Sequence, residues 1–573
     1  MRPWDGAAAG TAERSPGLTD RLRLLEPLVL PALLLLAALL RFPDLATRGT
    51  WDGDQGHDML VLRAFVRDGV VPLLGPPTSI GEVHHGAWYY YLLAPIAALT
   101  GGDSPLAVVT VIAASGVAAV GVVWWLARSV GGPLAGAVAG FVFAISVATI
   151  DESIFIWNPN LIALSSSVAL AGAWRAGGWR RIPWRAAWGV DPRPEPTGWA
   201  DGSPRWWLVA AAGTAVTMQC HVLGVTLLPV IAVPLVLDAR GRSLGRVPLG
   251  IVAIFAAAYA PLLANELTTG FSETRAAMDY LGSDRTSDTA AIPVRFGIVG
   301  LRVVSWPLIG LITDGFAAGV VATGVVVAIV AGLSRRASGA VAAVPVRLAV
   351  RWLALGLLWS SVFLTFAAPS LATAIPGLPN DHYHAFADPM VAVLVGLGFA
   401  AAIPGRRVTG ATAAAGVAAL VALLALVGWS ATHMPPPVHP DRGYPAGAAA
   451  GSRVLAALGR AGVELDDVVL LRSLPDFKST ESVAYPLVRA GQTIVARTPR
   501  GVAPGSATGS AAGAGQALVL ICDDLFRDAI GEACGGPAED RAVASVGALG
   551  ALLDRFEAHP GRWVSVYGSP PGS

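Results

Sequence analysis

Long runs of apolar residues fill most of the first three quarters of the chain, and short polar segments separate them. The runs have the length at which a helix crosses a bilayer, whose hydrocarbon core is about 30 Å thick. We therefore predict a polytopic α-helical membrane protein with about 11 transmembrane helices. The predicted spans are residues 26–42, 105–127, 133–150, 159–176, 206–221, 222–238, 247–265, 316–333, 349–369, 385–404 and 409–431.

Two apolar segments do not fit this series. Residues 87–100, "AWYYYLLAPIAALT", are too short to span and are rich in tyrosine, so they predict a helix in the outer membrane interface. Residues 293–312 are interpreted as a re-entrant or interfacial piece.

The pattern changes after the last predicted span. Residues 433–450 form a Pro/Gly-rich linker, and residues 451–573 alternate buried strands with helical stretches such as 446–462 and 541–557. This order predicts a small α/β domain.

The arginines orient the chain. With residues 1–24 as a polar cytoplasmic N-terminus, every predicted inner connection carries arginine, as the positive-inside rule requires. The transmembrane region 25–432 then has its first outer loop at residues 43–104, and the C-terminal domain is extracytoplasmic. The expected location is the plasma membrane, which in a bacterium is the inner membrane.

Composition excludes other classes of protein. Of the 573 residues 54% are hydrophobic and 14% charged, against about 25% charged in soluble proteins. The net charge is +1, without a basic patch, so no nucleic-acid partner is expected. No nucleotide-binding fingerprint occurs. Cys220 lies in a span, whereas Cys522 and Cys534 lie in the exported domain and are predicted to form a disulfide.

Polar residues gather on the outer face. The stretch "TWDGDQGHDM" follows the first span closely and holds three aspartates and a histidine. Three further outer segments contribute acids, imidazoles and amides. The candidate residues are Asp52, Asp54, Glu82, His84, His85, Asn158, Asn160, His221, His382, Tyr383 and His384.

Each of these residues also has a structural interpretation. Asp and Gly are common turn formers, "WNPN" can be a turn before a span, and His84 and His85 can cap the interfacial helix. The convergence of four distant segments on one face favours chemistry. A carboxylate there can act as a general base, and clustered His and Glu can hold a divalent cation.

The N-terminal half resembles the GT-C superfamily of polyprenyl-phosphate-dependent glycosyltransferases, in particular protein O-mannosyltransferases and lipid A aminoarabinose transferases. The resemblance rests on the acidic motif after the first span and on "GVVPLLGPPTSIGEVHHGAWYYYLLAP", and it covers roughly residues 25–225. It implies a GT-C-like fold with a polyprenyl-phosphate sugar donor in the membrane lipid. The C-terminal domain resembles no known family.

The resemblance also implies roles for single residues. Asp54 is similar to the family's catalytic aspartate, with Asp52 as the alternative, and Gln55 replaces the usual second acid. Glu82 matches a glutamate that binds metal in some members, and His84 or His85 takes the position of a basic residue that contacts phosphate. Three further matches are a phosphate or metal partner at His221, an outer-turn amide at Asn158 or Asn160, and a late aromatic motif at His382, Tyr383 and His384.

The implied activity is inverting transfer of a hexosyl or pentosyl group to a protein, lipid or cell-envelope glycan. Two alternatives remain open: a transporter or flippase of envelope lipids, and a polysaccharide polymerase or ligase. In a third alternative the chain is a structural assembly protein, whose exported C-terminal domain does the work and whose spans only anchor it.

Overall fold

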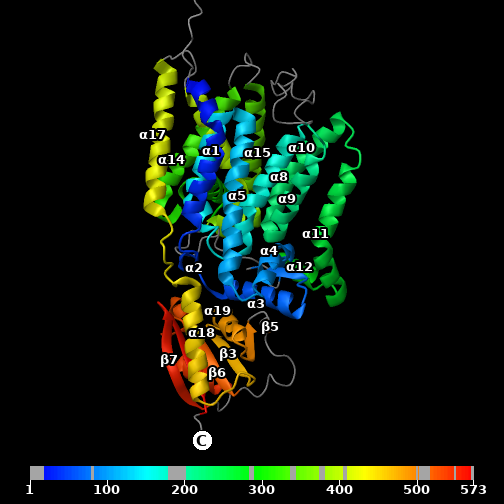
Figure 1. Ribbon diagram of the computed structural model, residues 1–573. Coiled ribbons are helices and arrows are strands. Elements are labelled where there is room, and N and C mark those ends of the chain that lie inside the picture. The colour runs from blue at the N-terminus through cyan, green and yellow to red at the C-terminus, as the bar shows by residue number, and fades with distance from the viewer. Residues whose placement is uncertain are drawn as a thin grey trace, which may run out of the picture.

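The protein is a helical bundle with a small sheet domain at one end, as the computed structural model shows (Figure 1). The structure describes residues 18–78, 83–177, 202–282, 290–310, 312–335, 343–372, 381–403, 410–498, 501–502, 516–546 and 550–569. Glu82 lies outside these residues.

Helices occupy all eleven predicted spans. The bundle helices are α1 (Leu18–Arg41), α5 (Pro105–Gly131), α6 (Pro133–Ile145), α8 (Ile162–Ala176), α9 (Trp206–Cys220), α10 (Leu227–Gly241), α11 (Val247–Thr269), α14 (Ile312–Arg335), α15 (Ala343–Ala367), α16 (Asp388–Ala402) and α17 (Gly410–His433). Within the described residues, eight helical segments are long and apolar enough to cross a membrane, and one of them is α13 (Ile292–Ile309). The chain is therefore a multi-pass membrane protein.

Local sequence sets the reversal between α5 and α6. Ser104 caps α5 by accepting a hydrogen bond from the backbone N–H of Ala107, and Pro105 takes the first helical position, where its missing N–H costs nothing. Gly132, with φ of 86°, ends α5, and Pro133 starts α6 directly afterwards.

Both halves of α13 contact the same end of the bundle. Arg295 donates to the carbonyl of Thr365 near the end of α15, and Trp306 donates to Glu152 in the turn that follows residue 151. The carbonyl of Ile309 accepts from Trp429 near the end of α17. The helix therefore has a span's length and apolar character, which differs from the re-entrant or interfacial piece predicted at 293–312.

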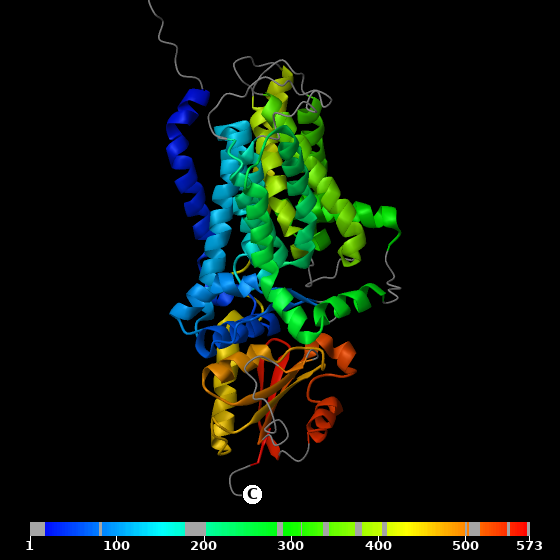
Figure 2. The same cartoon turned by 90° about the vertical axis from the view of Figure 1, so that its right-hand side faces the viewer.

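Short elements form a layer between the bundle and the sheet domain (Figures 1 and 2). They include the helix predicted at residues 87–100, which is α4. The elements are α2 (Leu45–Arg48), α3 (Gly53–Asp68), the antiparallel pair β1 (Leu74–Pro77) and β2 (His84–Gly86), α4 (Trp88–Leu99) and α12 (Ser272–Gly282). The short helix α7 (Val147–Asp151) follows α6.

The C-terminal domain is built on a six-stranded sheet in the order β5-β4-β3-β6-β8-β7. Its core strands β3, β4 and β6 are parallel, and β6 is buried throughout, as a central strand requires. The elements are α18 (Gly443–Arg460), β3 (Val469–Leu474), α19 (Glu481–Arg489), β4 (Ile494–Thr498), β5 (Gly501–Val502), β6 (Ala517–Asp523), α20 (Arg527–Ile530), α21 (Pro537–Ala544), β7 (Ala551–His559) and β8 (Arg562–Gly568).

Two details of the predicted domain differ from the structure. α18 begins inside the segment interpreted as a linker, and the helix predicted at 541–557 is wrong beyond Ala544, because residues 551–559 are the edge strand β7. β7 pairs with β8 through a tight turn, and this pairing overrides the helical pattern of the segment.

Candidate active site

The Asp52 side chain stabilises the start of α3 and its contact with the C-terminal domain. It caps α3 by accepting from the backbone N–H of Gly53 at 2.7 Å, while the side chain of Gln55 accepts from the N–H of Asp52 at 2.8 Å. The pair is a capping box, which explains a glutamine where the resembled family has a second acid. Lys478 and Arg562 of the C-terminal domain each lie 2.9 Å from the Asp52 carboxylate.

The Asp58 side chain also has a structural role. Its two carboxylate oxygens each accept a hydrogen bond of 2.8 Å, one from the hydroxyl of Tyr89 and the other from that of Tyr90. The side chain is buried, and desolvation raises its pKa to about 7. Asp58 therefore joins α3 to α4 and is closed to a substrate.

Asp54 is the aspartate of this motif that remains open. Its side chain is exposed, and no hydrogen bond to it occurs within the described part of the chain. Protein nevertheless surrounds the carboxylate on its other sides, so partial desolvation raises its pKa, and the charge of Asp52 raises it further. An accessible carboxylate with a raised pKa is suited to take a proton.

The first turn of α3 lies directly against the C-terminal domain. A Cβ added at Gly53 would lie 2.5 Å from the Ser479 side chain, and one at Gly56 would lie 2.2 Å from the carbonyl oxygen of Glu481. The two glycines of "DGDQGH" thus let the helix backbone approach the start of α19 (Figure 1).

Replacing Gly56 with alanine is expected to loosen this contact, because the new methyl group meets backbone that cannot rotate away. Limited proteolysis in detergent should release the C-terminal domain faster than from the wild type. Gly297→Ala is the matched control, since nothing lies within 4 Å of a Cβ at that helical position. Equal proteolysis of both variants would contradict the packing described.

The residues around the motif strengthen the same interface. Trp51 is buried against Tyr444 and Tyr485, and its indole N–H donates to the carbonyl of Ser482 at 2.9 Å. The carboxylate of Asp441 accepts from the Thr50 hydroxyl and from the backbone N–H of Trp51. The segment after α2 and the C-terminal domain therefore share one packed core.

A second cluster, the imidazole group, consists of His85, His221, His382, Tyr383 and Trp157. The ring centroids of His85 and His221 are 4.8 Å apart, and those of His221 and His382 are 5.4 Å apart. Tyr383 lies 5.1 Å from His221, and Trp157 lies 4.3 Å from His382. Four segments distant in sequence thus meet, although no hydrogen bond or ring contact among the described residues links this group to Asp54.

Hydrogen bonds fix the tautomers of two rings in this group. The backbone N–H of Val222 donates to Nδ1 of His85, and that of Leu223 donates to Nδ1 of His221. When Nδ1 accepts, the neutral ring carries its proton on Nε2.

His84 and His85 point to different partners, because neighbouring residues of a strand face opposite sides. Nδ1 of His84 lies 2.9 Å from the carboxylate of Glu273 on α12, and its backbone N–H donates to the other oxygen at 2.7 Å. His84 therefore fastens β2 to α12, while His85 joins the imidazole group.

The side-chain amides of Asn158 and Asn160 stabilise the turn in which they lie. Asn158 donates to the carbonyl of Cys220, next to His221, and Asn160 donates to the carbonyl of Phe155 at 2.8 Å. Both side chains are buried, so the structure gives them positioning contacts.

His384 belongs to a third, fully buried cluster. Arg302 donates to both carboxylate oxygens of Asp381, at 2.8 and 2.5 Å, and Nε2 of His384 lies 2.9 Å from the same carboxylate. Arg302 of α13 thus joins that helix to the segment that holds His384. Asp388, also fully buried, has no hydrogen-bond partner in the described structure.

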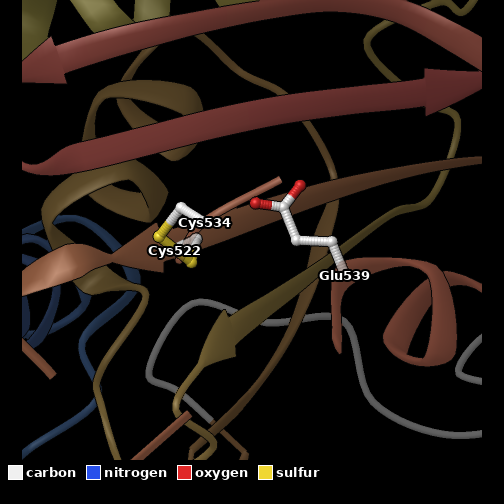
Figure 3. A group of neighbouring side chains, drawn as sticks. All are labelled: Cys522, Cys534 and Glu539. Atoms are coloured by element: carbon white, nitrogen blue, oxygen red, sulfur yellow. A yellow bond between two sulfur atoms is a disulfide. The ribbon is translucent and has the colours of Figure 1, made fainter. Parts of the chain in front are cut away.

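Cys522 and Cys534 form a disulfide (Figure 3). A metal ion needs several ligand atoms close together. Among the described residues, the His, Cys, Asp or Glu side chains that meet this condition are those of Cys522, Cys534 and Glu539. Both sulfurs are consumed by the disulfide, and Glu539 is bound to Arg555 at 3.0 Å and to Ser565 at 3.2 Å. This group therefore does not fit a metal.

Several site residues were not predicted from sequence. Lys478, Glu481 and Arg562 come from the C-terminal domain, and Glu273 and Arg302 come from helices that were interpreted without regard to their charges. One signal in the sequence could have identified Arg302. It is a charged residue in an apolar segment, where an ionisable group usually has a partner.

The chain matches no protein-family model and no curated protein. Among solved structures it is similar to ArnT from Cupriavidus metallidurans in the apo state, with 14% identity, a TM-score of 0.48 and coverage of 95% of this chain and 98% of that chain. It is also similar to the same protein bound to undecaprenyl phosphate, with 15% identity, a TM-score of 0.45 and coverage of 94% of this chain and 97% of that chain.

The Archaeoglobus fulgidus oligosaccharyltransferase tethered with an acceptor peptide is 13% identical, with a TM-score of 0.46 and coverage of 88% of this chain and 70% of that chain. Likenesses of this degree assign no role to any residue of the present chain.

Proposed function

We propose that the protein is a membrane glycosyltransferase that moves a sugar from a polyprenyl phosphate to an acceptor on the extracytoplasmic face, with Asp54 as general base. The observation that carries the proposal is the difference among the three aspartates of "TWDGDQGHDM". Asp52 and Asp58 are held by two partners each, whereas Asp54 is open and unpartnered in the described structure.

The donor phosphate belongs with the imidazole group. The Nε2–H group of His221 provides a donor for its oxygens, and the rings of His85 and Tyr383 pack beside it. Donors placed where negative charge develops on a leaving group lower the barrier to its departure.

The reaction then needs one proton transfer and one displacement. A carboxylate oxygen of Asp54 takes the proton from the acceptor O–H or N–H, and the acceptor atom bonds to the anomeric carbon. The bond from that carbon to the phosphate oxygen breaks, and the polyprenyl phosphate leaves with the electron pair. Attack from the opposite face inverts the anomeric configuration.

The disulfide supports the proposed orientation, because such bonds persist in oxidising, extracytoplasmic compartments. The contact between α3 and the C-terminal domain then supports the same compartment for Asp54.

Changing His221 to alanine is expected to raise KM for the lipid-linked donor about 10- to 150-fold, since one charge-assisted hydrogen bond to phosphate is lost, worth about 1.5–3 kcal/mol. The KM for the acceptor should change little. Steady-state kinetics in detergent with both substrates varied separately checks this, and a selective effect on the acceptor would contradict the placement.

The proposal itself is tested by incubating membranes that contain the protein with a panel of radiolabelled polyprenyl-phosphate sugars. Transfer of label to protein, lipid or glycan supports it and identifies the sugar. If no donor loses its label while the protein is folded and present, the proposal is wrong.

A further inference from the structure

We propose that the C-terminal domain is part of the reaction site, where Glu481 acts as a positioning residue that holds His57 beside Asp54. This inference rests on the proposed function, because it assigns a supporting role around the same base. It contradicts the alternative in which the C-terminal domain works alone and the spans only anchor it.

The contact between Glu481 and His57 joins the two domains. Nδ1 of His57 on α3 lies 2.9 Å from the carboxylate of Glu481, at the first position of α19. Glu481 is almost fully buried, and its second carboxylate oxygen accepts from the Ser479 hydroxyl. The carboxylate is therefore held in one orientation by its own domain before it meets His57.

His57 lies three residues after Asp54 on the same helix, so the two side chains are neighbours on one face. The charged groups around Asp54 come from every element packed there: Asp52, His57 and Asp58 from α3, Lys478 from the segment before α19, and Glu481 from α19. From α4, Tyr90 also interacts with Asp54, and its hydroxyl is bound to Asp58.

The pair has an electrostatic consequence for the base. Burial alone would lower the pKa of His57, but the hydrogen bond and the charge of Glu481, together with the charges of Asp58 and Asp54, outweigh it and raise that pKa. A protonated His57 in turn lowers the pKa of Asp54, opposing the upward effects of desolvation and of Asp52. The C-terminal domain thereby helps to keep the base ionised at neutral pH.

The experiment is the pH profile of kcat/KM for Glu481→Gln in the full-length protein. With Glu481 uncharged, the pKa of His57 falls, Asp54 loses a neighbouring positive charge, and its pKa rises. Loss of the Glu481 charge acts in the opposite direction, but His57 influences Asp54 more strongly than Glu481 does. The acidic limb of the profile should move up by about 0.5–1 pH unit.

Three further variants make the result specific. His57→Gln leaves Glu481 charged and unpaired, so the limb should move further than in Glu481→Gln. Ser479→Ala loosens the carboxylate without removing it, and should give a smaller shift in the same direction in a folded protein. Glu557→Gln is the control, because Glu557 is exposed on β7 and contacts Gly561 instead of α3.

An acidic limb that stays in place in Glu481→Gln and His57→Gln overturns the inference, whatever happens to the rate. If the wild type transfers sugar and Asp54→Asn does not, the proposed function survives that failure. If the wild type moves no sugar from any donor, the function and this inference are both wrong.

Discussion

Asp54→Asn is expected to lower kcat for sugar transfer by about 10²–10⁴-fold, the usual contribution of a general base. Asparagine has nearly the same size and shape, and the Asp54 side chain makes no hydrogen bond within the described residues, so the fold should be unaffected. The loss should appear in kcat, with the donor KM nearly unchanged, because the donor phosphate is placed at the imidazole group. Initial rates at saturating donor measure it.

Asp52→Asn is the control that separates the two acids. Asparagine is also a good N-cap, and Arg562 keeps its 2.7 Å contact with Asp523 when Asp52 loses its charge. We expect transfer to persist within about tenfold of the wild type. The assignment of Asp54 is wrong if Asp54→Asn is active and Asp52→Asn is not.

The second large effect is expected on stability, at the buried cluster around Arg302. Asp381→Asn leaves the guanidinium of Arg302 without its charged partner, although Arg302 and Asp381 are both almost fully buried. Breaking a buried ion pair on one side typically costs about 3–5 kcal/mol. The melting temperature of the purified protein in detergent should fall markedly.

Asp554→Asn provides the comparison for that measurement. It breaks the contact between Arg453, which is 52% exposed, and Asp554 in the C-terminal domain. Exposed pairs contribute about 0–1 kcal/mol, so its melting temperature should stay close to that of the wild type. Equal shifts in the two variants would contradict the described burial of Arg302 and Asp381.

The sequence was sufficient for features that depend on local pattern. Apolar length located helices at the predicted spans, and the cysteines of the C-terminal domain were paired because only two of the three lie there. Residues 293–312, interpreted as a re-entrant or interfacial piece, instead contain α13, one of the eight described helices that are long and apolar enough to cross a membrane.

The role of each aspartate could not be predicted, because the deciding partners are distant in sequence. Asp52 is neutralised by Lys478 and Arg562, which follow it by more than 400 positions. His84 and His85 were treated as alternatives for one position, and only the strand pairing of Gly86 with Leu74 fixes that they face opposite sides. The role of Glu481 could not be predicted from the sequence, because an acidic residue at the start of a helix is already explained by its favourable interaction with the helix dipole.

The most direct test of the account is transfer by the purified protein in liposomes that contain a radiolabelled polyprenyl-phosphate sugar and an acceptor extract. Wild type and Asp52→Asn are predicted to release the label from the lipid onto the acceptor, whereas Asp54→Asn leaves it on the lipid. The account is contradicted if Asp54→Asn releases the label from the lipid at the wild-type rate. It is also contradicted if none of the three proteins releases any label.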